Sequence, residues 1–385
     1  MRHHVLAAFA ALATLAAAVV SVRAPAWPVA FASPAPSPAP SCTGKSVFDL
    51  VSFHDARPQL AHGASAVILH DGRLRAVWYQ GSKELSPDVR IWTATFDGAG
   101  WSAARPIIGP AETTAGSGQY VNRLGNTVIF RDARGELVLV FAALGAVGGW
   151  DGVSLKVTRS RDEGETWSPP RNLATSPIFN FGTNVRGPAV PAESGGLTVL
   201  PTSHEFVTHF PELVLLDERD RVVGKRRIGI SHKGSQPFVL VQDARHAIAF
   251  MRMFRGFTLL SRTEDAGNSW TEPVPTTSVN RDVPVVAARI GDELLMVSSR
   301  LDHVTLRWSL VFAISADGGM NWRDIYVRPF GSDPLEMPKY PWLTIGNDGL
   351  YHLVFSFVHG TKGSELMHAR FSRDWVARQE GVPCR

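Results

Sequence analysis

The stretch SRDEGETW, at Ser160–Trp167, follows a run rich in β-forming residues and ends in a large aromatic side chain. Two later stretches repeat its pattern: TEDAGNSW at Thr263–Trp270 and SADGGMNW at Ser315–Trp322. All three have Asp in the third place, Gly in the fifth and Trp in the eighth. A motif that recurs along a chain indicates a repeat architecture, in which each copy belongs to one structural unit.

The chemistry of the motif predicts a tight hairpin turn. An Asp carboxylate accepts hydrogen bonds from backbone N–H groups of its own turn, and Gly allows a positive φ angle there. The Trp supplies a large apolar group that can fill the space between neighbouring sheets. We therefore interpret the three copies as folding devices and not as parts of an active site.

The spacing of related motifs predicts the fold. Weaker copies occur around Asp97, Asp217 and Asp374, and the Asp residues of all copies follow one another at intervals of 65, 55, 48, 52 and 57 residues. Between them lie short runs rich in Val, Ile, Phe and Trp, such as Ala64–Tyr79 and Leu350–Val358. A unit of about fifty residues that holds four short strands is typical of a propeller blade. The sequence therefore predicts an all-β, six-bladed β-propeller.

The composition is that of a globular protein rich in turns. The chain has 385 residues, of which 34 are Gly, 26 are Pro and 19% are charged, and its net charge is +4. Lys and Arg are scattered, without the cluster that would indicate a nucleic-acid surface. No metal-binding His or Cys spacing, phosphate-binding glycine loop or Gly-x-Ser-x-Gly elbow occurs. We therefore expect no metal, no cofactor and no nucleic-acid partner, and we expect a monomer.

The N-terminal region predicts export. MRHH is followed by an Ala-rich apolar run at Val5–Val22, and AFA at Ala30–Ala32 suits a cleavage site. We expect a signal peptide at 1–32, a Pro-rich linker at 33–45 and the propeller at 46–385, in the periplasm or outside the cell. An uncleaved membrane anchor is the alternative, because the apolar run is nearly long enough to cross a bilayer.

Two cysteines frame the expected propeller, Cys42 ahead of it and Cys384 at its end. In an exported protein such a pair predicts a disulfide, which would hold the two ends of the chain together and lock a closed ring. The alternative is two unpaired thiols.

The three copies resemble the Asp-boxes of the sialidase (neuraminidase) superfamily, whose catalytic domain is a six-bladed β-propeller. The resemblance covers roughly Phe53–Phe371 and is closest to bacterial Asp-box (BNR) repeat proteins described as predicted neuraminidases. It implies a carbohydrate-active protein whose partner is a glycan or an acidic sugar.

The resemblance implies that residues of the predicted first blade have catalytic or substrate-binding roles. The family's first carboxylate-binding arginine lies ahead of a strand and an Asp-Gly turn, where HGASAVILHDG has His62. The family's general acid lies in the loop after the next strand, and WYQGSKELSPDV has Asp88 there, with Glu84 close by. Asp88 is thus the implied acid, and its alternative role is to cap its own loop.

Four more positions follow along the chain. SQPFVLV has Gln236 where the family has the glutamate that acts as base, and Arg252, 16 residues later, matches the second arginine. Arg307 matches the third arginine, and Tyr340 in KYPWLTIGNDG matches the nucleophilic tyrosine. The two arginines would hold a substrate carboxylate, or alternatively form ion pairs on a strand rim. Tyr340 could instead pack in the core or stack on a sugar.

Two departures from the family pattern affect the chemistry. His62 replaces an arginine, which leaves it as a sugar ligand, a base or a structural histidine. Gln236 replaces the base, and a phenol with a pKa of about 10 is a poor nucleophile without one; Gln236 would bind sugar hydroxyls or support its strand. Arg186 and Glu205 could also reach the cleft as substrate ligands. Since side chains alternate along a strand, only one of His204 and Glu205 points inward.

Three functions remain open. The first is a glycoside hydrolase of exo-sialidase type, with Asp88 as acid and Tyr340 as nucleophile or electrostatic stabiliser. Arg252 and Arg307 would hold the acidic sugar. The second is a polysaccharide lyase on uronates, in which His62 or Tyr340 abstracts a proton while Arg252 neutralises the carboxylate. The third is a propeller that binds glycans without catalysis.

Overall fold

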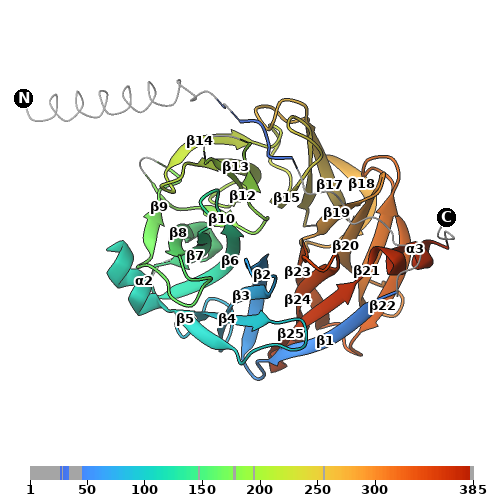
Figure 1. Ribbon diagram of the computed structural model, residues 1–385, viewed down its shortest axis with the longest axis horizontal. Coiled ribbons are helices and arrows are strands. Elements are labelled where there is room, and N and C mark those ends of the chain that lie inside the picture. The colour runs from blue at the N-terminus through green and yellow to red at the C-terminus, as the bar shows by residue number, and fades with distance from the viewer. Residues whose placement is uncertain are drawn as a thin grey trace, which may run out of the picture.

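The strands form a ring of sheets around a central axis (Figure 1). The computed structural model describes residues 27, 29–33, 46–145, 148–176, 179–193, 196–254 and 256–381. Within these residues the strands pair into six antiparallel sheets, one with five strands and the others with four. The innermost strand of each sheet borders the axis (Figure 1). The predicted all-β, six-bladed propeller is therefore confirmed.

Each blade is a meander of antiparallel strands. Blade 1 consists of β2 (Leu60–Ile68), β3 (Leu74–Gly81), β4 (Arg90–Phe96) and β5 (Arg105–Ile108). Blade 2 consists of β6 (Arg123–Arg131), β7 (Leu137–Leu144), β8 (Ser154–Ser160) and β9 (Arg171–Leu173). Blade 3 consists of β10 (Thr183–Val185), β11 (Val190–Pro191), β12 (Thr198–His204), β13 (Phe210–Leu216) and β14 (Val222–Arg227).

The second half of the chain repeats this plan. Blade 4 consists of β15 (Ser235–Val241), β16 (Ala247–Arg252), β17 (Gly256–Thr263) and β18 (Val274–Asn280). Blade 5 consists of β19 (Val286–Ile290), β20 (Glu293–Leu301), β21 (Trp308–Ser315) and β22 (Arg323–Phe330). Blade 6 consists of β23 (Glu336–Ile345), β24 (Tyr351–His359), β25 (Ser364–Phe371) and β1 (Phe48–Asp55). The connections hold α2 (Pro110–Ser117), α3 (Arg373–Glu380) and the short helices η1 (Trp150–Gly152) and η2 (Gly360–Lys362).

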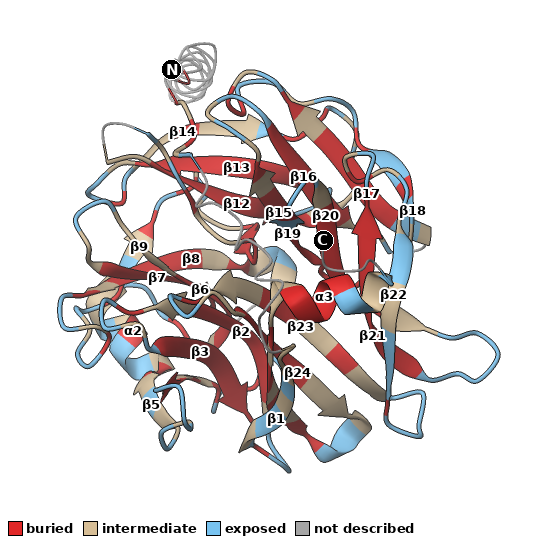
Figure 2. Ribbon diagram, turned by 45° about the vertical axis from the view of Figure 1, so that its right-hand side comes forward, coloured by how far each residue is buried: buried red, intermediate tan, exposed pale blue. Residues whose placement is uncertain are grey.

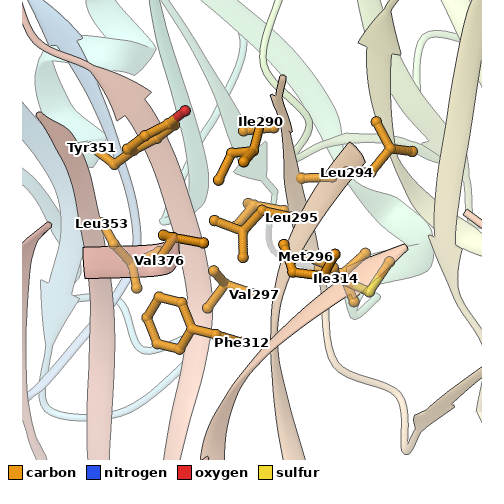
Figure 3. Packing of buried hydrophobic residues seen from close by; sticks show 14 of the residues in the cluster. Ile290, Leu294, Leu295, Met296, Val297, Phe312, Ile314, Tyr351, Leu353 and Val376 are labelled. Carbon is orange, nitrogen blue, oxygen red and sulfur yellow. The ribbon is translucent and has the colours of Figure 1, made fainter. Parts of the chain in front are cut away.

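Apolar side chains of adjacent blades form shared buried clusters. The inner strands are mostly buried, whereas exposed residues lie in the loops and on outer strands such as β18 and β22 (Figure 2). Strands β7 and β21 are buried along their whole length, as expected where a sheet is covered on both faces. Between blades 5 and 6, Val297 and Phe312 share one apolar cluster with Leu353 of β24 (Figure 3). Each such side chain stabilises the fold by about 1.5–3 kcal/mol when fully buried. The layers between blades are thus a major source of stability.

Strand β1 closes the ring. It comes from the N-terminal side of the chain and pairs antiparallel with β25, from Phe48 opposite Phe371 to Asp55 opposite Glu365. The last blade therefore combines three strands from the end of the chain with one from its beginning. Helix α3 adds to this seam, because Trp375 stacks on Phe48 with 4.4 Å between the ring centroids.

The repeated motif forms the turn between the third and fourth strands of its blade. In the first copy, Asp162 accepts hydrogen bonds from Thr166 N at 2.9 Å and Thr166 Oγ1 at 2.6 Å. Gly164 N donates to Ser160 Oγ at 2.7 Å, which tightens the same turn. The second and third copies have equivalent bonds, from Ser269 to Asp265 and from Asn321 to Asp317. The interpretation of the motif as a folding device is confirmed.

The Trp of the motif packs between blades, whereas the weak copy of the motif at Asp374 does not form a hairpin. Trp322 of blade 5 lies edge-on against Phe250 of blade 4, with 5.7 Å between centroids, so it fills the space between blades as predicted. The weak copy at Asp374 is not a hairpin but part of the first turn of α3. The reason is topological: the fourth strand of blade 6 is β1, so no hairpin follows β25.

A segment ahead of β1 packs between blades 3 and 4. Phe31 is fully buried and Trp27 is 9% exposed. Phe31 N donates to Ala244 O at 2.9 Å, and Trp27 Nε1 donates to Ala266 O at 2.8 Å. Both aromatic residues lie inside the predicted signal peptide at 1–32. The folded unit thus includes residues ahead of the predicted boundary at 46, and cleavage within AFA would remove them.

Other predictions concern residues outside the described ranges. The described ranges leave out the whole apolar run at Val5–Val22, nearly all of the Pro-rich linker, Cys42 and Cys384, so the signal peptide, the anchor and the disulfide stay predictions. Among the described residues, no helix has the length and apolar character needed to cross a membrane.

Candidate functional site

A pocket of about 400 Å³ opens at one end of the propeller axis. Gln236 lies near the start of the innermost strand β15 and Arg252 ends the second strand β16, so the pocket lies where inner strands begin. The Asp motifs join third and fourth strands and therefore lie at the opposite end of the ring. The pocket walls include Asn126, Trp150, Asn184, Glu205, His209, His232, Lys233, Ser235, Gln236, Arg252, Asp282 and Tyr340.

Irregular pairing of the innermost strands shapes the pocket. Register shifts in β2, β6, β15 and β23 insert extra residues next to the axis. In three of these shifts an extra residue has a positive φ: 63° at Gly63, 49° at Gln236 and 53° at Tyr340. Such angles cost non-glycine residues on the order of 1–3 kcal/mol each, and they concentrate at functional sites. The backbone of Gln236 and Tyr340 therefore favours a functional role for both.

Tyr340 and Arg252 meet in the pocket, as their family positions imply. Arg252 Nη1 donates to Tyr340 Oη at 3.5 Å, and Arg252 Nε donates to Ser235 Oγ at 3.2 Å. Arg252 also forms an ion pair with Asp282 at 3.2 Å. Burial opposes the charge of Arg252, but Tyr340 and Asp282 outweigh burial and raise its pKa. The pocket therefore holds a permanent positive charge beside the tyrosine hydroxyl.

Arg186 binds backbone and is not a wall of the pocket. Its guanidinium donates to the carbonyl oxygens of Ala64 at 2.9 Å, Tyr340 at 2.7 Å and Pro341 at 3.1 Å. Its central carbon lies 5.2 Å from the centroid of the Tyr340 ring. Burial lowers the pKa of Arg186 to about 10. The expected role as a substrate ligand is therefore replaced by another: Arg186 ties together the strands that carry Tyr340 and His62.

His62 lies against Tyr340 and is not among the described residues that line the pocket. It is 3% exposed, and its ring meets the Tyr340 ring edge-on at 4.4 Å between centroids. Burial, helped by the charges of Lys339 and Arg186, lowers its pKa well below the usual value of 6.5. A neutral, enclosed imidazole cannot supply the charge that an arginine gives at this position. Of the three alternatives, the structural histidine fits this geometry.

Glu205 places a buried carboxyl group in the pocket wall, with 7% of the residue exposed. Asn184 Nδ2 donates to Glu205 Oε2 at 3.0 Å. Burial raises the pKa of Glu205 above its usual value. The neighbouring His204 points away from the pocket and stacks on Phe210, with 4.6 Å between the ring centroids. Of this pair only Glu205 therefore points inward, as the alternation of side chains along a strand predicts.

Several buried polar atoms around the pocket have no hydrogen-bond partner among the described residues. They are Gln236 Oε1, Asn126 Oδ1, His62 Nδ1 and Tyr79 Oη. An unpaired buried polar group costs about 1–3 kcal/mol, so proteins rarely keep one without a use. Gln236 and Asn126 line the pocket itself. A ligand rich in hydroxyl groups would supply partners for both.

Asp88 and Arg307 are also absent from the pocket walls. Asp88 is exposed and accepts hydrogen bonds from Ser82 N at 2.9 Å and Ser82 Oγ at 3.0 Å. Ser86 and Ser82 lower its pKa, which makes it a poor proton donor at neutral pH. Asp88 thus caps its own loop, the alternative that its position allowed. Arg307 is exposed between β20 and β21, so of the two predicted arginines only Arg252 is among the described residues that line the pocket.

Glu84 is closer to the site than Asp88. It is exposed and absent from the pocket walls, yet burial and then the Glu84 carboxylate raise the pKa of Tyr79. Tyr79 in turn contacts His62, with 5.8 Å between ring centroids. Glu84 therefore lies beside the group of rings that supports Tyr340.

The pocket walls also include Trp150, Asn126, Asn184 and Asp282, which were not predicted from the sequence. These residues come from separate loops and strand starts, and single amides carry no local signal. Trp150 had one visible signal, since it is a Trp next to glycines and outside the repeated motif. Its ring packs so closely on Gly125 that a Cβ there would lie 2.5 Å from Trp150 Cη2.

Comparison with known proteins agrees with the propeller fold. A profile of the BNR repeat-like domain matches residues 72–353. A protein of unknown function from Dyadobacter fermentans has 13% identity and a TM-score of 0.69, over 85% of this chain and 98% of that one. Trypanosoma rangeli sialidase in complex with sialic acid has 15% identity and a TM-score of 0.65, over 90% of this chain and 61% of that one. No curated protein matches the sequence.

An intramolecular trans-sialidase from Ruminococcus gnavus has the same fold, with 12% identity and a TM-score of 0.59 over 82% of this chain and 95% of that one. The fold is therefore that of a sialidase-like β-propeller. The chain belongs to the BNR repeat-like domain family, because the match at 72–353 spans well over half of it. The resemblance to the sialidase superfamily is thereby confirmed at the level of family and fold.

Proposed function

We propose that this protein is an exported glycoside hydrolase that removes a terminal acidic sugar from a glycan bound in the axial pocket. One observation carries the proposal: Tyr340, Arg252 and Gln236, which occupy family positions, line a single pocket together. Two of them, Gln236 and Tyr340, also have a positive φ, so the backbone is strained at the same place.

The pocket offers each kind of contact that an acidic sugar needs. The charged Arg252 guanidinium suits a sugar carboxylate, and charge-assisted bonds of this type are strong. Trp150 offers an aromatic face for the apolar side of a sugar ring. The unpaired Gln236 Oε1 and Asn126 Oδ1 would accept hydrogen bonds from sugar hydroxyls. Tyr340 Oη would stabilise positive charge at the anomeric carbon.

The relatives favour the same class of substrate. One neighbour in fold is a sialidase in complex with sialic acid, and another is a trans-sialidase in complex with oseltamivir carboxylate. With Gln236 in place of the family's glutamate, Tyr340 has no carboxylate base at that position. We therefore expect it to act as an electrostatic stabiliser.

The test is a panel of aryl glycosides of sialic, ulosonic and uronic acids. We expect release of the aryl alcohol from at least one of them, and a loss of about 100-fold or more in Arg252→Met and in Tyr340→Phe. Arg307→Met is the matched control, because Arg307 is an exposed arginine outside the pocket. Equal losses in Arg307→Met and Arg252→Met would overturn the assignment of the pocket.

A polysaccharide lyase is the second candidate. It is favoured because the Tyr340 hydroxyl is hydrogen-bonded to the cationic Arg252 and not to a carboxylate. A lyase leaves an unsaturated product that absorbs in the ultraviolet, and a hydrolase does not. Rising absorbance on uronate polymers would establish the lyase. Binding without turnover of any panel member would establish a glycan-binding propeller instead.

A further inference from the structure

The side chain of Glu205 is held in one orientation by amides of two blades. Asn184 Oδ1 accepts hydrogen bonds from Asn126 Nδ2 at 3.2 Å and from its neighbour Val185 N at 2.9 Å. Because both donors bind the carbonyl side of the Asn184 amide, its NH₂ group must face Glu205. That NH₂ group donates to Glu205 Oε2 at 3.0 Å. Glu205 N is itself anchored to Gly182 O at 2.7 Å.

This arrangement uses only one carboxyl oxygen. Glu205 Oε1 accepts no hydrogen bond from any described residue, and Glu205 lines the pocket that also holds Tyr340. The charged groups that face Glu205 are Arg252, His209 and Asp282. Arg252 is already paired with Asp282, and Glu205 forms no ion pair within the described part of the chain. Burial outweighs the attraction of Asn184 and Arg252 and raises the pKa of the carboxyl.

We propose that Glu205 is the catalytic acid of this pocket, which protonates the glycosidic oxygen of the bound glycan, and that Asn184 and Asn126 are its positioning residues. The proposal rests on the proposed hydrolase function. It gives Glu205 the role that the family pattern implies for Asp88, whose exposed carboxylate is occupied by Ser82.

Glu205 would give up one proton and regain one in each turnover. The proton on Glu205 Oε1 passes to the glycosidic oxygen while the bond from that oxygen to the anomeric carbon breaks, and the electron pair stays with the departing alcohol. A water molecule then bonds to the anomeric carbon from the side that the alcohol has left. One proton of that water passes to the Glu205 carboxylate, so the enzyme returns to its starting state. Neither Tyr340 nor Gln236 needs to change its protonation state.

The first experiment compares leaving groups in the full-length protein. An acid matters most when the departing alcohol is a poor leaving group, so Glu205→Gln should lose about 100-fold or more on a sugar-linked substrate. On a nitrophenyl glycoside, whose leaving group needs no proton, the loss should be less than about 10-fold. Asp88→Asn is the matched control and should behave as wild type on both. Equal losses for both leaving groups in Glu205→Gln, or the selective loss in Asp88→Asn, would overturn the proposal.

The second experiment reads the proton itself and needs no turnover. Infrared difference spectra of wild type against Glu205→Gln, recorded across a pH series, report whether residue 205 carries a carboxylic acid or a carboxylate band. We expect the acid band to persist to a pH clearly above 4.5, the usual value for Glu. Asn184→Ala should change the frequency of this band, because it removes the donor to Oε2. Ionisation at or below the usual value would overturn the proposal, whereas failure of the whole glycan panel would overturn the hydrolase function instead.

Discussion

Tyr340 combines a strained backbone with an unusual anchor. Its φ of 53° is sterically costly for a bulky residue, and the surrounding structure must hold it in place. Arg186 does so through the carbonyl oxygens of Tyr340 and Pro341, while its guanidinium lies over the Tyr340 ring. The hydroxyl of Tyr340 is then directed at Arg252. The position of one phenol is thus determined by two arginines with different tasks.

Arg186→Lys tests this positioning role. Lysine is a point donor and cannot span the carbonyl oxygens of Ala64, Tyr340 and Pro341 as the planar guanidinium does. We expect kcat to fall by about 10-fold or more while KM changes little, because Arg186 does not line the pocket. Steady-state kinetics on the best panel substrate would measure both constants. A rise in KM with kcat unchanged would instead make Arg186 a substrate ligand.

Glu205 predicts a pH dependence of stability. Its folded-state pKa is raised by burial above the usual 4.5, so its contribution is fully present below that value and is lost as pH rises through the folded pKa. Glu205→Gln has nearly the same shape and does not titrate. We therefore expect the variant to gain stability relative to wild type as pH rises. Thermal unfolding of both proteins from about pH 4 to about pH 8 would measure this, and a constant difference would contradict it.

At the scale of elements, the Asp turns and the N-terminal segment stabilise the ring without touching the pocket. Hydrogen bonds from Thr166 and then from Ser160 hold the pKa of Asp162 at about 2, below the usual 3.8. Because the folded pKa is depressed, the contribution is present above 3.8 and is lost as pH falls toward about 2.

Asp162→Ala should therefore lower the free energy of unfolding by about 1 kcal/mol at neutral pH. The difference from wild type should shrink in acid. Turnover should not change, since the turn lies at the end of the propeller opposite the pocket. Chemical denaturation at two pH values and one activity assay would check all three statements. A loss of activity in the folded variant would contradict the purely structural role of the motif.

Phe31→Ala tests the N-terminal segment. Phe31 is fully buried between blades 3 and 4, and removing a buried Phe side chain typically costs about 3–5 kcal/mol. We expect a loss near the lower end of that range, because Trp27 still holds the segment. Val51→Ala is the control, as Val51 is 48% exposed on β1. N-terminal sequencing of the protein isolated from its native cells should also find Trp27 retained, and a chain that starts at Ser33 would contradict this packing.

At the scale of the molecule, the spacing of one motif was enough to predict the ring. The Asp-to-Gly-to-Trp pattern marks the turn between third and fourth strands, so its period counts blades. The closure could not be predicted this way. Strand β1 has no motif, and its partner β25 lies some 300 residues away, as Asp49 opposite Arg370 illustrates. Hydrogen-bonded strands close the ring where the sequence suggested only a disulfide.

The site was predictable only where it depends on strands. Gln236, Arg252 and Tyr340 lie on strands with fixed positions in their blades, and they meet as the family pattern implies. Asp88 and Arg307 lie in loops, where the direction of a side chain depends on local turns that similar sequences need not share. Glu205 was named as a candidate from the sequence alone. Its hydrogen bond to Asn184, and the bond from Asn126 of blade 2 that orients Asn184, depend on how blades 2 and 3 pack together.

The most direct test of the proposed sugar site is a crystal structure determined from crystals soaked with the free acidic sugars of the panel. We predict one sugar in the axial pocket, with its ring against Trp150 and its carboxylate within about 3 Å of the Arg252 guanidinium. The anomeric carbon should face Tyr340 Oη, and its hydroxyl should face Glu205 Oε1. A pocket that stays empty at saturating sugar, or a sugar whose carboxylate points away from Arg252, would contradict the account.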